Sequence, residues 1–271
     1  MSRPAGRNSR LFHPMLPVLA VTAALAAGGC QNTLTTGSIT KEATTADAAK
    51  PGASREQLEA AAKLQKDFKK DPGDADVALA FSESLKQIGR GQESAGVLKM
   101  ANEENPGDPR ILSAYGRQVL RDGNPAEALA LLKEAESAGA VTAQVYSAQG
   151  AALDQLGRNE EARKRYEQAL ALDPGNSAVL ANLGLSYALS NEIGQAESTL
   201  RMAAADPMAN PKVRQNLALV LAMQGKFREA EGLVSRDLPP EDVAVNMAYL
   251  KQMMSASNRW DRLKNIDGAT G

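Results

Sequence analysis

Apolar residues in the body of the chain recur at the spacing of amphipathic helices, and the pattern repeats every 34 residues. One position is occupied by a small residue in successive copies: Ser82, Gly116, Gly150, Gly184 and Ala218. A second small series is Ser94, Ala128, Ala162, Ala196 and Ala230. A bulky series is Leu98, Leu132, Tyr166, Leu200 and Val234. A turn series is Gly89, Gly123, Gly157, Asn191 and Gly225. Each copy therefore predicts two helices joined by a tight turn.

Each series has a physical role in a pair of packed helices. The first falls midway along one helix and the second early in the next, so small side chains allow the two helices to approach closely. The bulky series fills the space between them. The turn series follows the first helix, where glycine or asparagine adopts the left-handed conformation that ends a helix. Prolines mark further ends: Pro72, Pro106, Pro174 and Pro207 follow second helices, and Pro109 and Pro211 open first helices.

These positions resemble the tetratricopeptide (TPR) repeat, whose pattern combines a large residue, Leu-Gly, Tyr, Ala, an aromatic residue, Ala and Pro. The copy at 143–176 supplies Tyr146, Gly150, Leu153, Ala162, Tyr166, Ala169 and Pro174. Other copies depart from the pattern, since Ala140 replaces one proline and Asp237 replaces the final alanine of the last copy. The resemblance implies an all-α, right-handed superhelical solenoid of about five helix pairs with capping helices at both ends.

The N-terminal segment has the layout of a secretory signal peptide. Residues 1–10 carry three arginines and no acid, and residues 11–27 are apolar apart from His13 and Thr22. A transmembrane anchor is the competing interpretation. Its length is borderline for a span, and its prolines and small residues make it weakly hydrophobic. The pattern favours a signal peptide over residues 1–29.

Cys30 is the only cysteine of the chain, and it follows Ala27-Gly28-Gly29. This segment resembles the bacterial lipobox, in which the cysteine is modified with diacylglycerol and becomes the mature N-terminus, although the lipobox prefers Leu at the position of Ala27. Cleavage after Ala24-Leu25-Ala26, which leaves a soluble periplasmic protein with a free thiol, is the alternative. We predict lipidation, because a lone thiol is a liability in an oxidising compartment. Through the same resemblance, Gln31 implies a lipid anchor at the periplasmic face of the outer membrane.

Removal of residues 1–29 takes away His13, the only histidine, and changes the formal net charge from −1 to −4 through the loss of three arginines. A chain without histidine or a free thiol excludes Ser-His and Cys-His pairs and His-ligated metal sites. The near-neutral composition with few aromatic residues lacks the electrostatic footprint of nucleic-acid binding. We therefore expect a non-enzymatic protein with no cofactor, metal or small-molecule substrate, which acts through protein partners.

Composition divides the mature chain into a tether and a folded body. Residues 30–54 are rich in Thr, Ala, Gly and Ser, which predicts a flexible tether that reaches about 80 Å when fully extended. Residues 55–74 predict an N-terminal capping helix and residues 75–238 the five repeats. Residues 239–271 predict a C-terminal capping helix and tail.

The C-terminal part carries a more specific resemblance. Segment 213–254 looks like the C-terminal portion of TadD-type proteins, TPR lipoproteins of the tight-adherence (Tad, Flp pilus) secretion system. The matching features are Arg214-Gln215-Asn216-Leu217-Ala218, Asp237-Leu238-Pro239-Pro240, Asn246 and Ala248-Tyr249-Leu250. The resemblance implies a non-catalytic periplasmic scaffold for pilus assembly, with a secretin or another Tad component as partner. The alternative is a TPR lipoprotein adaptor for outer-membrane protein assembly outside the Tad system.

In TPR folds the first helix of each pair lines a concave, protein-binding face. Through this resemblance, one helix of the chain contributes Arg110, Arg117 and Arg121, whose spacings of seven and eleven residues place them on one side. Two interpretations stay open: a solvated basic face, or a groove that accepts acidic side chains or a C-terminal carboxylate. The carboxylate clamp of chaperone-binding TPR proteins needs Lys and Asn, which Ser113 and Arg117 do not supply.

The fourth and fifth copies contribute an apolar strip to the same face. Its members are Ala178, Ala181, Leu185, Ala188, Leu189, Leu219, Ala222 and Met223. The segment 180–189 is apolar nearly all round, which indicates burial on every side. Either a partner helix or strand or the chain's own C-terminal segment would bury it. We favour the C-terminal segment, which offers Met247, Tyr249, Leu250, Met253, Met254 and Trp260.

Overall fold

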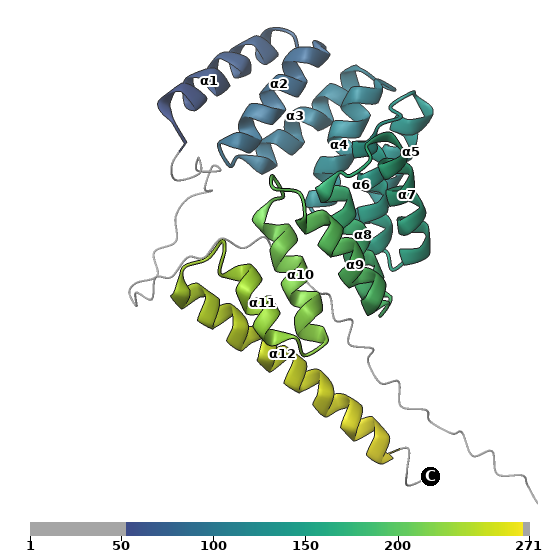
Figure 1. Ribbon diagram of the computed structural model, residues 1–271. Helices are drawn as coiled ribbons and strands as arrows, with labels where there is room; N and C mark the ends of the chain where they lie inside the picture. Colours follow the sequence, from purple (N-terminus) through teal and green to yellow (C-terminus); the bar gives the residue numbers. More distant parts are fainter. Residues whose placement is uncertain (1–52, 268–271) are drawn as a thin grey trace, which may run out of the picture. The chain divides into compact units, whose positions relative to one another are not determined.

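The computed structural model describes the backbone of residues 53–267 and the side chains of residues 53–255. The predicted signal peptide, Cys30 and nearly all of the predicted tether lie outside these residues, as does the side chain of Trp260. Within the described residues the chain forms twelve α-helices and no strand (Figure 1). The predicted all-α fold is confirmed. None of the described helices combines the length and the hydropathy needed to span a membrane.

The helices form five successive pairs between two outer helices. The pairs are α2 (Ala75–Gln87) with α3 (Gly91–Glu104), α4 (Pro109–Arg121) with α5 (Pro125–Ser137), α6 (Ala143–Gln155) with α7 (Asn159–Leu172), α8 (Ser177–Leu189) with α9 (Ile193–Ala204), and α10 (Pro211–Met223) with α11 (Phe227–Val234). Helix α1 (Arg55–Lys70) precedes the first pair and α12 (Pro240–Asp267) follows the last.

The two helices of a pair meet where the sequence alternates small and bulky residues. An added Cβ would come within 3 Å of a bulky side chain at Gly116 (2.9 Å from Leu132), Gly150 (2.5 Å from Tyr166) and Gly184 (2.6 Å from Leu200). In the first pair both small positions are serine, and the buried Ser82 and Ser94 hydroxyls form a hydrogen bond of 2.9 Å. The predicted contact between the small and bulky series is confirmed.

The turn between the two helices of each pair has the predicted backbone conformation. All four glycines of the turn series and Asn191 have positive φ angles, between 61° and 86°. Among the non-glycine residues of the described chain, only Asn191 has a positive φ angle. Asparagine tolerates this left-handed region better than most residues. Pro109 and Pro211 lie in the first turns of α4 and α10, where no N–H is needed.

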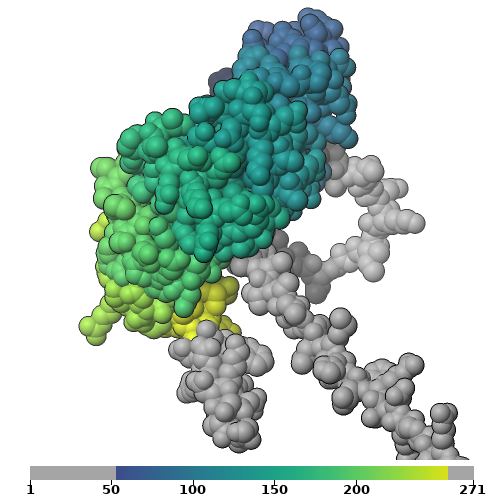
Figure 2. Space-filling model, turned by 90° about the vertical axis from the view of Figure 1, so that its right-hand side faces the viewer, coloured from purple at the N-terminus to yellow at the C-terminus, as the bar shows by residue number. Residues whose placement is uncertain are grey.

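The first helices of the pairs line the inner side of the stack. Helices α2, α4, α6, α8 and α10 each contact the next member of this series, whereas successive second helices make no contact with one another in the described residues. The pairs follow one another along the body in sequence order, as the gradual colour change in Figure 2 shows. The stack therefore curves toward the first helices, as in a TPR solenoid.

Helix α12 continues the stack beside the last pair. It contacts α10 and α11 but not α8. Its Val243, Met247 and Leu250 are buried in one core cluster with Leu217 of α10. The prediction that the C-terminal segment covers the apolar strip is wrong at α8, where Leu189 is 61% exposed. The physical reason is that α10 and α11 already bury the apolar side of α12.

Candidate protein-binding groove

The inner side of α4 carries the three arginines singled out in the sequence, and one of them is paired within the chain. Arg110 Nη1 lies 2.5 Å from Asp76 Oδ1 of α2, and its Nη2 lies 3.0 Å from Asp108 Oδ2. Asp108 is also the N-cap of α4 and accepts hydrogen bonds from the first backbone N–H groups of that helix. Arg110 therefore already has two carboxylate partners.

Arg117 and Arg121 form no ion pair with an acid in the described part of the chain. Arg117 Nε donates to the Ser113 carbonyl of its own helix at 3.3 Å, and Arg121 donates to Gln118 Oε1. Burial, followed by the nearby charge of Arg117, lowers the pKa of Arg121, although a guanidinium stays charged at any physiological pH. Two like charges one helical turn apart thus lack a paired counter-charge, a condition that favours an anionic ligand.

An open pocket of about 510 Å³ lies beside Arg121, at the turn between α2 and α3. Its lining consists of Glu83, Lys86, Gly89, Gly91, Gln118 and Arg121. Lys86 is paired with Glu83 within this wall. Arg121 is therefore the cation of the pocket that has no acidic partner among the described residues.

The centre of the inner side is polar and bonded internally. Asp154 of α6 accepts hydrogen bonds from the Tyr166 hydroxyl at 2.9 Å, Ser186 Oγ at 2.7 Å and Asn159 Nδ2 at 2.8 Å. Burial raises the pKa of Asp154 above its ordinary value, and these three bonds act against that rise. The carboxylate thus connects α6 with α7 and α8. These partners lie 5, 12 and 32 residues from Asp154, so the 34-residue period did not reveal them.

The inner side becomes apolar at α8 and α10. Leu189 is 61% exposed and Met223 is 38% exposed, while Leu185 and Leu219 are half-buried. Ala181, which the sequence also places here, is buried in the core. We use the term groove for the inner surface formed by Arg117, Arg121, Leu185, Leu189, Leu219 and Met223. It is basic at α4 and apolar at α8 and α10.

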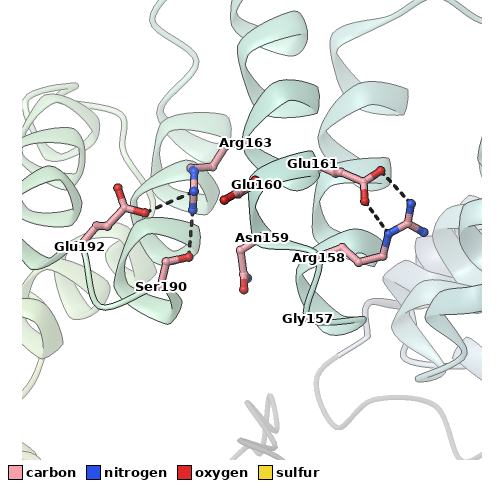
Figure 3. A pocket seen from close by; sticks show the side chains of 8 residues that line it. All are labelled: Gly157, Arg158, Asn159, Glu160, Glu161, Arg163, Ser190 and Glu192. Atoms are coloured by element: carbon pink, nitrogen blue, oxygen red, sulfur yellow. Dashed lines mark hydrogen bonds and ion pairs between the residues drawn. The ribbon is translucent and has the colours of Figure 1, made fainter.

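A second open pocket, of about 530 Å³, lies at the turns that follow α6 and α8 (Figure 3). Both of its arginines are paired with acids that also line the pocket. Arg158 makes two bonds with Glu161, at 2.8 and 2.7 Å. Arg163 reaches Ser190 at 2.9 Å and Glu192 at 3.2 Å. The Arg158–Glu161 contact lies within the first turn of α7, and we assign the contacts of Arg163 to the packing of neighbouring pairs. Among the described residues there is also no group of three potential metal ligands from His, Cys, Asp and Glu.

The structure joins two segments that the TadD resemblance matched separately. Arg214 of α10 pairs with Asp237 through Nε–Oδ2 at 2.6 Å and Nη2–Oδ1 at 2.5 Å. Arg214 also donates to the Ala209 carbonyl at 3.1 Å. Asp237 replaces the usual alanine of the repeat, and its bidentate contact fixes the connection to α12 against α10.

Comparison with known proteins supports the repeat and the fold. Residues 150–190 match the family model for the TPR repeat. The chain resembles a thermophilic TPR protein of Thermus thermophilus, with 25% identity and a TM-score of 0.57 over 64% of this chain and 96% of that one. It also resembles PilW, a widely conserved type IV pilus biogenesis factor, with 16% identity and a TM-score of 0.62 over 69% of this chain and 88% of that one. No curated protein matches the chain by sequence.

Proposed function

We propose that the chain is a non-catalytic, lipid-anchored periplasmic scaffold that binds a protein partner in the groove during assembly of the Tad/Flp pilus apparatus. The observation that carries the binding role is that no described part of the chain covers the groove. Its two arginines lack acidic partners among the described residues, and Leu189 and Met223 remain exposed at its other end. A partner that supplies carboxylates and apolar side chains would stabilise both ends of this surface.

The pilus part of the proposal rests on the sequence resemblance of segment 213–254 to TadD-type proteins. The Arg214–Asp237 contact gives the resemblance a structural sense, because it connects two of the matched segments. PilW acts in type IV pilus biogenesis, but at 16% identity its likeness to this chain is one of fold. The secretin of the apparatus is the partner that we propose.

The anchoring part of the proposal rests on the resemblance of residues 27–30 to a lipobox. One acyl chain holds a protein weakly, but each buried methylene adds about 0.8 kcal/mol, so a three-chain lipoprotein anchor is stable. The tether then allows the repeats to act at a distance from the outer membrane.

The experiment compares cells that lack the chain with cells that carry it or a variant. The readouts are surface pili and the amount of secretin multimer in the outer membrane. We expect both to fall without the chain and with Arg117→Glu/Arg121→Glu, and to be retained with the charge-matched Lys133→Glu/Lys164→Glu. These lysines are exposed and lie on second helices.

Normal piliation in cells without the chain would overturn the pilus role. A loss of other outer-membrane β-barrels, with the secretin unchanged, would favour the alternative of a general outer-membrane assembly adaptor. Normal piliation and secretin assembly with Arg117→Glu/Arg121→Glu, at wild-type abundance of the variant, would show that the groove does not bind the partner.

A further inference from the structure

Helix α12 presents a second apolar stripe on the side that faces away from the core. Val243, Met247 and Leu250 form the buried stripe. Val245 and Tyr249, one turn apart on another side of the helix, are 71% and 63% exposed. An ordinary terminal helix of a solenoid carries polar residues on its outer side, because that side faces water. The exposed stripe of α12 therefore indicates a contact.

Two acids extend this stripe toward the start of the helix. Glu241 and Asp242 are exposed and form no ion pair in the described part of the chain. Glu241 precedes Val245 and Tyr249 by four and eight residues, and Asp242 precedes them by three and seven. These spacings place the acids and the apolar residues on one face. We call this surface, formed by Glu241, Asp242, Val245 and Tyr249, the outer face of α12.

The groove is complementary to the outer face of α12 in both charge and polarity. The groove offers the arginines of α4 and the apolar side chains of α8 and α10, whereas the outer face offers two acids followed by two apolar residues. Among the described large apolar residues, the four most exposed are Met208 (89%), Val245 (71%), Tyr249 (63%) and Leu189 (61%). Three of these four lie on the two complementary surfaces.

We propose that the outer face of α12 in one copy of this chain binds in the groove of a second copy. Asp242 and Tyr249 are separated by about 10 Å along the helix axis. The axes of α4 and α8 lie about 16–20 Å apart, because α6 packs between them. The long Arg and Glu side chains bridge the difference between this distance and the length along α12. The contact is a helix lying in a groove, with Tyr249 against Leu189 and the acids against Arg117 and Arg121.

The contact occurs between two copies because α12 cannot reach the groove of its own chain. In its own chain α12 packs on α10 and α11 and has no contact with α8. Detaching it would expose Val243, Met247 and Leu250, which are buried. The proposed contact joins different surfaces of the two copies, so it is head-to-tail and leaves one groove and one α12 free in each open assembly.

The test uses photo-crosslinking in cells that produce the full chain in two tagged versions. One version carries a photo-crosslinking amino acid in place of Leu189. We expect a crosslinked product that contains both tags, and we expect mass spectrometry to map the second site to residues 241–252. A product formed with another protein alone, or no product, overturns the proposal.

Charge reversal on each surface provides the specific control. Arg117→Glu/Arg121→Glu in the groove, or Glu241→Lys/Asp242→Lys on α12, present in both copies, should lower the crosslink yield by about tenfold. Mixing one copy of each variant restores opposite charges in both possible contacts, so the yield should recover. Lys133→Glu/Lys164→Glu should leave the yield unchanged. The proposal is also overturned if the crosslink yield is unchanged by the charge reversals. The same holds if the yield does not recover in the mixture although circular dichroism shows that both variants fold normally. A second copy and the secretin would occupy the same groove, so Arg117→Glu/Arg121→Glu affects both proposals. The crosslink between the two tags and the Glu241→Lys/Asp242→Lys variant report on the contact between copies alone.

Discussion

Gly150 lies where α6 and α7 approach most closely, and its replacement tests the packing principle of the repeat. In an ordinary exposed helix, alanine is more stable than glycine by up to about 1 kcal/mol, because glycine loses more conformational freedom on folding. In α6, the Cβ of Gly150→Ala would lie 2.5 Å from Cε1 of Tyr166 and 2.8 Å from its Cδ1 and Cζ. The steric cost therefore opposes the gain in helix propensity.

The steric cost is the larger of the two effects. Tyr166 is 1% exposed, and its hydroxyl donates to Asp154 at 2.9 Å, so the ring is held from both ends. Overpacking a buried site costs about 1–3 kcal/mol, and a contact this short belongs to the upper part of that range. After subtraction of the propensity gain, we expect Gly150→Ala to lower the free energy of unfolding by about 1–2 kcal/mol.

The assay is thermal unfolding of the purified chain followed by circular dichroism. A loss of this size corresponds to a fall in Tm of about 3–6 °C for a chain of this length. Hydrogen exchange should become faster in α6 and α7 first, since a solenoid loses stability locally. Gly96→Ala is the matched control, because an added Cβ at Gly96 has no atom within 4 Å and should raise Tm. If Gly150→Ala melts at or above the wild-type temperature, the close-packing argument is refuted.

Three further predictions concern the last repeats and the N-terminus. Hydrogen bonds, first from Lys226, lower the pKa of Glu197 from 4.5 to about 2. The resulting stabilisation is present above pH 4.5 and lost as the pH falls toward 2; its size is about 1 kcal/mol because solvent screens the partly exposed partners. Glu197→Gln should therefore reduce the fall in Tm across this pH range, and an unchanged fall contradicts the assignment. Arg214→Lys removes the bidentate contact with Asp237, which should accelerate hydrogen exchange in α12 by about tenfold and leave α2 unaffected; equal acceleration in both helices contradicts a local role. Cys30→Ser should move the chain from the membrane fraction to the soluble fraction, and unchanged fractionation contradicts lipidation.

The repeat positions could be predicted from sequence because each has the same local task in every copy. Gly150 faces Tyr166 just as Gly184 faces Leu200, so the periodic series alone identified the contact. The left-handed turn at Asn191 was predictable for the same reason. Contacts between equivalent positions of adjacent repeats follow the period as well. The Arg110–Asp76 ion pair spans 34 residues, and this spacing could have revealed it.

Contacts that break the period could not be predicted in this way. The bond from Ser186 to Asp154 depends on how far neighbouring pairs rotate against each other, which the repeat pattern does not specify. The bond from Tyr166 to Asp154 lies within one pair and needs a hydroxyl and a carboxylate that the other copies lack. The course of α12 depends on a competition between two apolar surfaces for one helix. The sequence shows that the surface of α8 and the surface of α10 and α11 are both apolar. Only the packing shows that α12 lies on α10 and α11.

The polar contacts between adjacent pairs give the solenoid an uneven stiffness. In the described residues, Arg110–Asp76 is the only hydrogen bond or ion pair between side chains of the first and second pairs, and both residues are exposed. The third and fourth pairs are held together by several contacts, including Ser186–Asp154 and Arg163–Glu192. A bending motion would therefore concentrate at the joint between α3 and α4. There α2 and α3 would move as a unit against α4. The pocket between Lys86 and Arg121 would widen and narrow, whereas the groove would keep its shape because its residues all lie on α4, α8 and α10.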